Sequence, residues 1–480
     1  MRRAAPAPII VAMSTPPAIA IIGAGFCGVV SAIELLRSRL PAGTRIVLLE
    51  RPGHGIGGPA YDVTSERLLL NVRAERMSAF AEVPGDFVDY LAATHPGESA
   101  ASFAPRRYFG QYLATRLDGA AYREGSKSVL EPTAAEVVDI EPVESGGWLV
   151  RADAGVRSLS FAADAVLLAT GASTPLAPRW LEPWMVDEAR YVDAFGLAAA
   201  RVHDDATVVA IGSGLSFVDL VIELRATGFR GRIVAISRHG RLPRSEGRAI
   251  PLPEPDDLPA AIASQEPLSV RGLLRVLTGH AAALAARGRD YRSMLAALRP
   301  HSARLWAGLG HAERGRFLRH ARALWDVHRH RMPEAIARLI EAEVQAGSVQ
   351  VVAGRILSVG RSAQGLTLNV RRRGAWSAEP LDARLIVNCT GAVAGAPLGN
   401  PWPALIARGA ATRDAHGLGV LTDSTGRLIG AAGRPVPRLY YAGPLWRGQE
   451  WEVTAVPELR ARLPALAAAI AGVVRPPDLA

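Results

Sequence analysis

Two glycine-rich stretches of the chain are candidates for binding nucleotide phosphates. The first, Gly23-Ala-Gly25-Phe-Cys-Gly28, follows the apolar run 18–22 and precedes a helical pattern. In such a turn the first glycine permits the tight bend, the second lets backbone N–H groups approach a pyrophosphate, and the third lets helix and strand pack closely. The helix N-terminus adds unpaired donors and a positive dipole end. We therefore predict a dinucleotide site here.

An acidic residue stands where a ribose would lie. Glu50 ends the next expected strand, TRIVLLE, 22 residues after Gly28. At that position a carboxylate accepts hydrogen bonds from a ribose diol. The pattern predicts an FAD site, with Gly171 of a later Thr-Gly turn nearby. Its predicted residues are Gly23, Gly25, Phe26, Cys27, Gly28, Glu50, Arg51 and Gly171.

The second stretch, Gly212-Ser-Gly214-Leu-Ser-Phe217, departs from the pattern at its third position. A bulky Phe217 is expected to push helix and strand apart, but a helical pattern follows and the next strand ends at Ser237-Arg238 instead of at an acid. An arginine there can pair with a 2′-phosphate. We therefore predict an NADPH site. Its predicted residues are Gly212, Gly214, Leu215, Ser216, Ser237 and Arg238.

The elements that must position these turns repeat along the chain. Each turn is followed by a short β-meander that ends in Thr-Gly, over residues 135–171 and again over 349–391. This repeat predicts an α/β fold with two Rossmann-like dinucleotide-binding domains, one for FAD and one for NADPH, with β-meanders and a helical insertion. The predicted divisions are a disordered leader at 1–16, a first FAD part at 17–175, an NADPH domain at 205–345 with its helical insert at 255–345, and a second FAD part at 346–480.

Bulk properties exclude several classes of protein. At 480 residues, with 49% hydrophobic and 21% charged residues, the chain is expected to be soluble, globular and cytoplasmic, with Met1 or Met13 as the true start. No apolar run matches a bilayer span, so we expect no membrane partner. The net charge of +10 comes from scattered arginines, which disfavours nucleic acid as a partner. Cys27 and Cys389 form no CxxC pair, which disfavours a disulfide relay and a cysteine zinc site.

These motifs together resemble the two-dinucleotide-binding flavoproteins, specifically the bacterial FAD/NAD(P)-binding proteins related to N-hydroxylating flavin monooxygenases. The resemblance spans nearly the whole chain and is carried by IAIIGAGFCG, LLLNVRAERMSAF, VLLATGAS, VVAIGSGLSFVDL, WDVHRHRMP, VNCTG and YYAGPLWRGQEWEVTAVPELR. It implies that Asn71 and Met77 lie near the flavin. It also implies that Gly443, Thr454 and Val456 complete the FAD pocket, although Pro444 stands where many flavoproteins have an aspartate.

The substrate side is less defined. Arg106, Arg447 and Glu452 are polar residues within the family-like segments, and Arg107, Arg329 and His330 are our candidates for contacting substrate, since an arginine can hold a carboxylate. His328 and His330 are two residues apart on a predicted helix and do not share a face, so we expect no metal. No catalytic residue is assigned.

The cofactors indicate the reaction class. We expect an FAD- and NADPH-dependent monooxygenase that hydroxylates or N-oxidises a small amine- or carboxylate-bearing metabolite with molecular oxygen through a peroxyflavin. The chain lacks the FxGxxxHxxxWP signature of Baeyer–Villiger enzymes. Two alternatives stay open: a flavin reductase or dehydrogenase without oxygen transfer, and a nucleotide-binding protein without turnover. The sequence does not indicate an oligomeric state.

Overall fold

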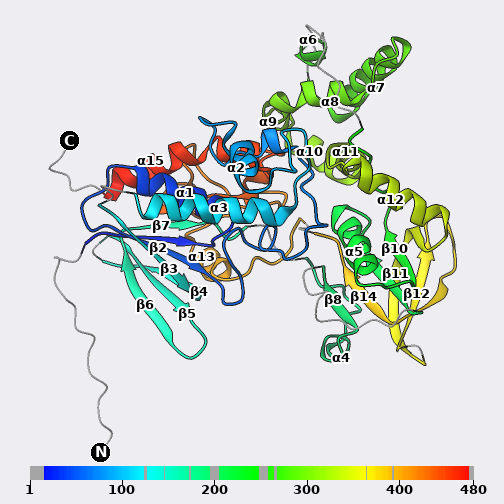
Figure 1. The fold of residues 1–480 in the computed structure, drawn as a ribbon, viewed down its shortest axis with the longest axis horizontal. Helices are drawn as coiled ribbons and strands as arrows, with labels where there is room; N and C mark the ends of the chain where they lie inside the picture. The colour runs from blue at the N-terminus through cyan, green and yellow to red at the C-terminus, as the bar shows by residue number, and fades with distance from the viewer. Residues whose placement is uncertain are drawn as a thin grey trace, which may run out of the picture.

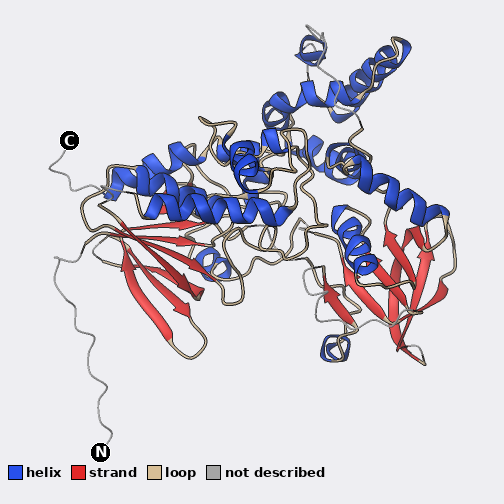
Figure 2. Cartoon of the chain, in the orientation of Figure 1, coloured by secondary structure: helices blue, strands red, loops and turns tan. Residues whose placement is uncertain are grey.

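The structure is a computed structural model, and it describes residues 16–123, 127–144, 146–171, 175–194, 205–247, 258–263, 267–363, 365–391 and 394–474. The predicted leader, apart from Pro16, lies outside these residues. Figure 1 and Figure 2 show two halves, each built on its own sheet, with a group of helices projecting from the second half.

The first half is built on a six-stranded sheet with the order β15–β16–β7–β1–β2–β3. All neighbouring strands are parallel except β15 and β16. The strands are β1 (Ala18–Ile22), β2 (Arg45–Glu50), β3 (Val129–Ala134), β7 (Ala165–Leu168), β15 (Arg427–Ile429) and β16 (Pro435–Tyr441). Every residue of β1 is buried, as expected for a parallel strand covered on both faces.

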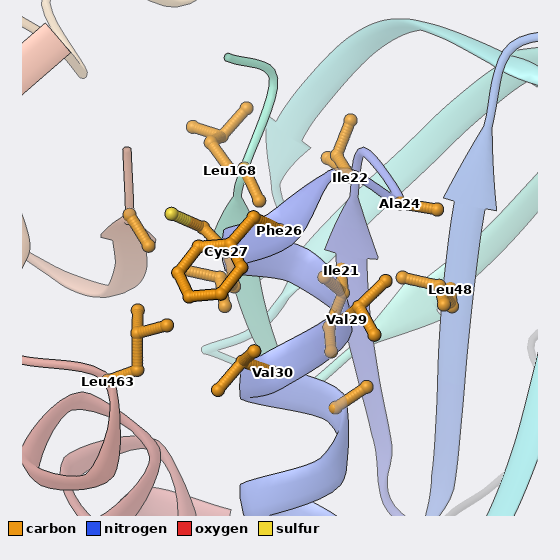
Figure 3. Close-up of a cluster of buried hydrophobic side chains, with 14 of the residues drawn as sticks. Ile21, Ile22, Ala24, Phe26, Cys27, Val29, Val30, Leu48, Leu168 and Leu463 are labelled. Atoms are coloured by element: carbon orange, nitrogen blue, oxygen red, sulfur yellow. The ribbon is translucent and has the colours of Figure 1, made fainter. Parts of the chain in front are cut away.

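The central helix of this half is α1 (Phe26–Arg37), which packs between α3 (Arg106–Ala121) and α15 (Leu463–Val474). Figure 3 shows Phe26, Val30 and Leu463 meeting the strand residues Ile21 and Leu168 in one buried cluster. The remaining elements here are η1 (Ala74–Arg76), α2 (Asp86–Thr94), α13 (Trp402–Ala407), η5 (Pro444–Gly448), α14 (Val456–Arg460) and an antiparallel sheet of β4 (Glu136–Pro142), β5 (Trp148–Asp153) and β6 (Ser158–Ala163).

The second half is built on a seven-stranded sheet with the order β13–β12–β11–β10–β9–β14–β8. Strands β8 to β11 and β14 run parallel, and β12 and β13 extend the sheet as an antiparallel pair. The elements are α4 (Pro183–Asp187), β8 (Tyr191–Asp193), β9 (Thr207–Ile211), α5 (Leu215–Ala226), β10 (Arg232–Ser237), α12 (Glu334–Gln345), β11 (Val349–Ser362), β12 (Gly365–Arg372), β13 (Glu379–Ala383) and β14 (Leu385–Asn388).

This topology corrects one predicted boundary. The sequence predicts that everything from residue 346 onwards belongs to the FAD domain, but β11 pairs with β10 and β14 pairs with β9. A central parallel strand must satisfy its backbone groups on both sides, so residues 349–388 belong with the second sheet. We therefore propose that the second part of the first half begins after residue 388.

The projecting helices form the predicted insertion between β10 and β11. They are α6 (Leu258–Ala263), α7 (Val270–Ala286), α8 (Arg292–Leu298), η3 (Arg299–His301), α9 (Ser302–Gly308), α10 (His311–Arg316), the π-helical turn η4 (Phe317–Ala321) and α11 (Arg322–Arg329). Two small apolar clusters hold them together, the second of which includes Trp451 from the first half. None of the described helices combines the length and apolar character that crossing a bilayer requires.

Candidate active site

The first glycine turn joins β1 to α1 at a close approach. Gly23 has φ +107°, and a Cβ there would lie 2.5 Å from the carbonyl oxygen of Ala169. A Cβ on Gly28 would overlap the Gly23 carbonyl oxygen. By contrast, no described atom lies within 4 Å of a Cβ placed on Gly25. Two glycines therefore allow the packing, and the third leaves the backbone at the start of α1 open to a phosphate.

Glu50 fixes the same turn from the end of β2. Its Oε2 accepts a hydrogen bond from the Ala24 N–H at 2.6 Å, and its Oε1 accepts one from the Arg51 N–H at 3.0 Å. Each carboxylate oxygen can accept a second hydrogen bond, so the pairing leaves capacity for a ribose diol. Phe26 and Cys27, which we predicted as cofactor contacts, have their side chains buried in the first core, so only their backbone faces the turn. Arg51 is exposed.

A second glycine pair, which the sequence analysis missed, lies against this turn. The Gly57 N–H donates to the Ala24 carbonyl at 2.8 Å, and Gly57 has φ +102°. A Cβ on Gly58 would stand 3.2 Å from the Gly25 Cα. The signal was present in the glycine-rich segment that follows Arg51, and it indicates a close backbone approach.

The carboxyl ends of β7 and β16 complete this edge of the sheet. Gly443 has φ +148°, and a Cβ there would lie 2.6 Å from the Tyr441 hydroxyl. That hydroxyl accepts from the Leu445 N–H at 2.7 Å and reaches the Gly171 carbonyl at 3.5 Å. Burial raises the Tyr441 pKa well above its ordinary value, which keeps the hydroxyl protonated as a donor. Tyr441 therefore joins the turns at Gly171 and Gly443, and sequence reasoning did not single it out.

The other residues predicted around the flavin take separate places in this half. Met77 is buried in the first core at the end of η1, whereas Asn71 is exposed on the same loop. Thr454 and Val456 lie at the start of α14, which packs against α1. Their contact with a flavin stays a prediction.

The second turn repeats the first. Gly212 has φ +102°, and a Cβ there would lie 2.7 Å from the Cys389 carbonyl oxygen, as Gly23 lies against Ala169. Nothing described lies within 4 Å of a Cβ on Gly214, and α5 begins at Leu215 with Ser216 half-buried. Phe217 is fully buried in the second core. Its side chain does not disrupt the turn and instead fills the space beneath α5.

Two serines tie the second turn to the loop after β10. The hydroxyls of Ser213 and Ser237 lie 2.9 Å apart. Ser237 also accepts from the Gly240 N–H at 3.0 Å, and Ser213 donates to the Arg241 carbonyl at 2.6 Å. The predicted residue Ser237 is therefore a structural anchor of this loop, and Ser213 is the partner that the sequence analysis did not name.

Cations gather at the end of β10. Arg238 and Arg241 are exposed, and the Arg373 Nη1 lies 3.3 Å from the His239 Nδ1. Burial first, and then the charges of Arg241, Arg373 and Arg238, lower the His239 pKa. A position that disfavours an added proton favours an anion, so this edge of the second sheet is suited to a phosphate.

The three predicted substrate residues divide between two places. Arg107 pairs with Glu66 at 3.2 Å near the surface of the first half. Arg329 lies at the end of α11, where its guanidinium pairs with Glu452 at 2.6 Å, and His330 follows it. Burial is the main cause that lowers the His330 pKa. Only Arg329 and His330 therefore share a site.

That site holds further charged groups below the surface. Glu452 is 5% exposed and also accepts from the Trp325 indole N–H at 2.8 Å. Arg447 stacks over the Trp451 ring at 4.0 Å and lies 3.7 Å from Asp326. Burial, with the nearby Arg322, lowers the Arg447 pKa to about 10. The loop after Gly443 and helix α11 therefore meet through a network of buried charges.

Comparison with known proteins agrees with this geometry. Residues 20–173 match the family described as FAD-NAD(P)-binding. This segment belongs to the FAD-NAD(P)-binding family. The match covers the first glycine turn and the strand that ends at the Ala169–Gly171 turn, and it confirms the family resemblance that the sequence motifs indicated. No curated protein sequence matches the chain.

Solved structures share the fold over nearly the whole length. An ornithine hydroxylase (PvdA) from Pseudomonas aeruginosa is 15% identical, with 96% of this chain and 100% of that chain covered at a TM-score of 0.62. An L-lysine 6-monooxygenase from Pseudomonas syringae is 17% identical, with 96% and 100% covered and a TM-score of 0.61. A bacillithiol disulfide reductase from Bacillus cereus is 14% identical, with 95% and 99% covered and a TM-score of 0.55. The predicted fold class is thereby confirmed.

The family match assigns FAD-NAD(P)-binding to residues 20–173 of the chain. Its structural relatives include both oxygenases and disulfide reductases, and a fold alone does not distinguish these reactions.

Proposed function

We propose that the protein is an NADPH-oxidising FAD monooxygenase that acts on a small metabolite. The observation that carries the proposal is the pair of matched turns. Each has one glycine forced against a neighbouring carbonyl, at Gly23 and Gly212, and one glycine with open space beside it, at Gly25 and Gly214. The second turn adjoins the loop after β10, where Arg238, Arg241 and Arg373 lie near His239. One turn thus fits FAD, and the other fits a nicotinamide dinucleotide with a 2′-phosphate.

Each half contributes its own part of the binding. In the first, backbone N–H groups from Gly25 into α1 would hold the FAD pyrophosphate, and Glu50 would accept from the ribose. In the second, the start of α5 would hold the NADPH pyrophosphate, and Arg238 with Arg241 would bind the 2′-phosphate. FAD, when bound, supplies hydride acceptance from NADPH and reactivity with oxygen.

The cysteines favour oxygen over a disulfide as the electron acceptor. Cys27 and Cys389 are the two cysteines of the chain, and both are buried. Burial raises the pKa of each thiol to about 12. Thiol–disulfide exchange requires an accessible thiolate, so neither cysteine is suited to relay electrons to a disulfide.

The proposal is tested by mixing the FAD-loaded protein with NADPH or NADH under anaerobic conditions. We expect the oxidised-flavin absorbance to bleach faster with NADPH. After oxygen is admitted with candidate substrates, the ratio of oxygenated product to hydrogen peroxide distinguishes a monooxygenase from a reductase. Absence of bleaching with either nucleotide would overturn the self-contained NADPH oxidoreductase and leave the nucleotide-binding alternative.

A further inference from the structure

An apolar cavity of about 320 Å³ lies within the helical region, where α7, α8, α9 and α11 approach the loop that contains Trp451. This volume falls within the range of small-molecule pockets, roughly 300–1,000 Å³. Its wall is formed mainly by leucine, methionine and tryptophan, including Leu277, Met294, Leu298, Trp306 and Trp325. Among the described residues that line it, none is Asp, Glu, Lys or Arg.

The cavity opens to solvent on one side. Leu274 on α7 and Leu324 on α11 both line it, and they are 38% and 39% exposed. Contiguous apolar surface left in water is unfavourable by about 25 cal/mol per Å² and marks a binding surface when it gathers in one hollow. An apolar ligand would cover both leucines.

Tyr291 and His328 place two polar groups side by side in the apolar wall, with the tyrosine hydroxyl 3.0 Å from the His328 Nδ1. We refer to this part of the cavity as the Tyr291–His328 end. Arg244 is not part of the cavity wall, but its backbone is held beside His328. Its N–H donates to the Val327 carbonyl at 2.9 Å, and its carbonyl accepts from the Met332 N–H at 2.8 Å.

The Arg244 side chain is available to a ligand. It is exposed and forms no ion pair with any residue in the described part of the chain. By contrast, the adjacent Arg292 and Arg331 pair with Asp290 and Glu246. Burial and then the charge of Arg244 lower the His328 pKa, which agrees with a cationic mouth at this end.

We propose that this cavity binds the apolar chain of an organic acid, with the carboxylate held by Arg244 at the Tyr291–His328 end. A cationic amine would lie near the like charge of Arg244, and the described residues of the cavity wall include no carboxylate to pair with it. This distinguishes the site from one for the basic amino acids named for the ornithine and lysine hydroxylases of similar fold. Trp451 forms a wall of the cavity and lies in the segment between Gly443 and α14, which also contains the predicted FAD residue Thr454. The acid's role as substrate rests on the proposed function.

Direct binding tests the proposal. The FAD-loaded full chain is titrated with decanoate, decanol and decylamine below their micelle concentrations, by calorimetry and by the fluorescence of the cavity tryptophans. Because a charge-assisted hydrogen bond is lost with the alcohol, we expect decanoate to bind about 10-fold more tightly than decanol, with decylamine weakest.

Four variants locate the two ends of the ligand. Arg244→Ala is expected to abolish the preference for decanoate over decanol, and Arg244→Lys to retain most of it. Leu324→Glu, at a half-exposed wall position, is expected to weaken decanoate about 10-fold or more. Arg287→Ala is the matched control, because Arg287, like Arg244, is exposed and outside the cavity wall, but it follows the end of α7 instead of lying beside Val327 and His328. Circular dichroism confirms that each variant is folded.

Equal affinity for decanoate and decanol would overturn the carboxylate assignment, and no binding of any probe would overturn the cavity assignment. These results are separable from the proposed function. Bleaching of the flavin by NADPH without decanoate binding would overturn the proposed acid site but not the proposed function. Decanoate binding without bleaching would overturn the proposed oxidoreductase function but not the acid site.

Discussion

The Arg106 guanidinium lies 2.9 Å from the Asp219 carboxylate and joins the two halves of the molecule. Arg106 begins α3 of the first half, and Asp219 lies in α5, the helix that follows the second glycine turn. A second contact between the halves joins Ser65 to Glu223, with their side-chain oxygens 2.5 Å apart. The helix of the second turn is thus held against the first half by two polar contacts.

Removing Arg106 should leave the Asp219 carboxylate without its ion-pair partner and lower the unfolding free energy. Burial, the larger cause, raises the Asp219 pKa, and Arg106 lowers it. For Arg106→Ala we expect a loss of about 1–3 kcal/mol in unfolding free energy at pH 7, between the values for surface and buried pairs. When folding raises the pKa of an acid, the protonated acid contributes to the stability of the fold at pH values below its unfolded-state pKa. This contribution to stability is lost as pH rises through the folded-state pKa. The deficit should therefore shrink as pH falls toward 4.

Urea denaturation over pH 4–8 measures this effect. Adding Asp219→Asn to Arg106→Ala removes the unpaired charge and should recover part of the stability and flatten the pH dependence. A deficit that is unchanged from pH 8 to pH 4 would show that the carboxylate is not the cause.

Two glycines of the first turn should respond differently to alanine. Gly25→Ala places a methyl group in open space at φ −71°, so the apoprotein should fold with unchanged melting temperature but lose most bound FAD. Gly28→Ala drives a methyl group into the Gly23 carbonyl and should destabilise the fold itself. Flavin content after purification and thermal unfolding of the apoprotein check both expectations. Full FAD occupancy in Gly25→Ala would contradict the proposed pyrophosphate position.

Arg238 should select the 2′-phosphate. Losing a charge-assisted contact with a phosphate costs about 1.5–3 kcal/mol, so Arg238→Ala should raise the Kd for NADPH by about 10-fold or more and leave that for NADH nearly unchanged. Arg230→Ala, an exposed arginine that precedes β10, serves as the control. Equal weakening for both nucleotides would place the 2′-phosphate elsewhere.

Replacing Phe217 by glycine, the residue typical of the third position of such turns, should destabilise the protein. Phe217 is fully buried with Val208 and Leu385, so Phe217→Gly should cost about 3–5 kcal/mol from the lost core contacts and about 1 kcal/mol from glycine in a helix. Thermal unfolding and NADPH titration measure the outcome. Unchanged stability would show that the phenylalanine is not a core residue.

Local patterns predicted much of the fold because they depend on residues close in sequence. The spacing of Gly23, Gly25 and Gly28 between an apolar strand and a helix predicted the first turn, and the repeat of strand, turn and meander predicted two similar units. Both predictions needed only short-range geometry, and the family match and the solved structures agree with them. The assignments of individual cofactor contacts stay predictions.

The sequence by itself determined the two glycine turns and the α/β class, because backbone sterics and strand periodicity are local properties. Only the tertiary structure decided that residues 349–388 complete the second sheet, that Phe217 packs into a core, and that Tyr441 joins two distant turns. It also separated Arg107 from Arg329 and formed the apolar cavity. Each of these depends on contacts between segments far apart in the chain, for which a single sequence carries no periodic signal.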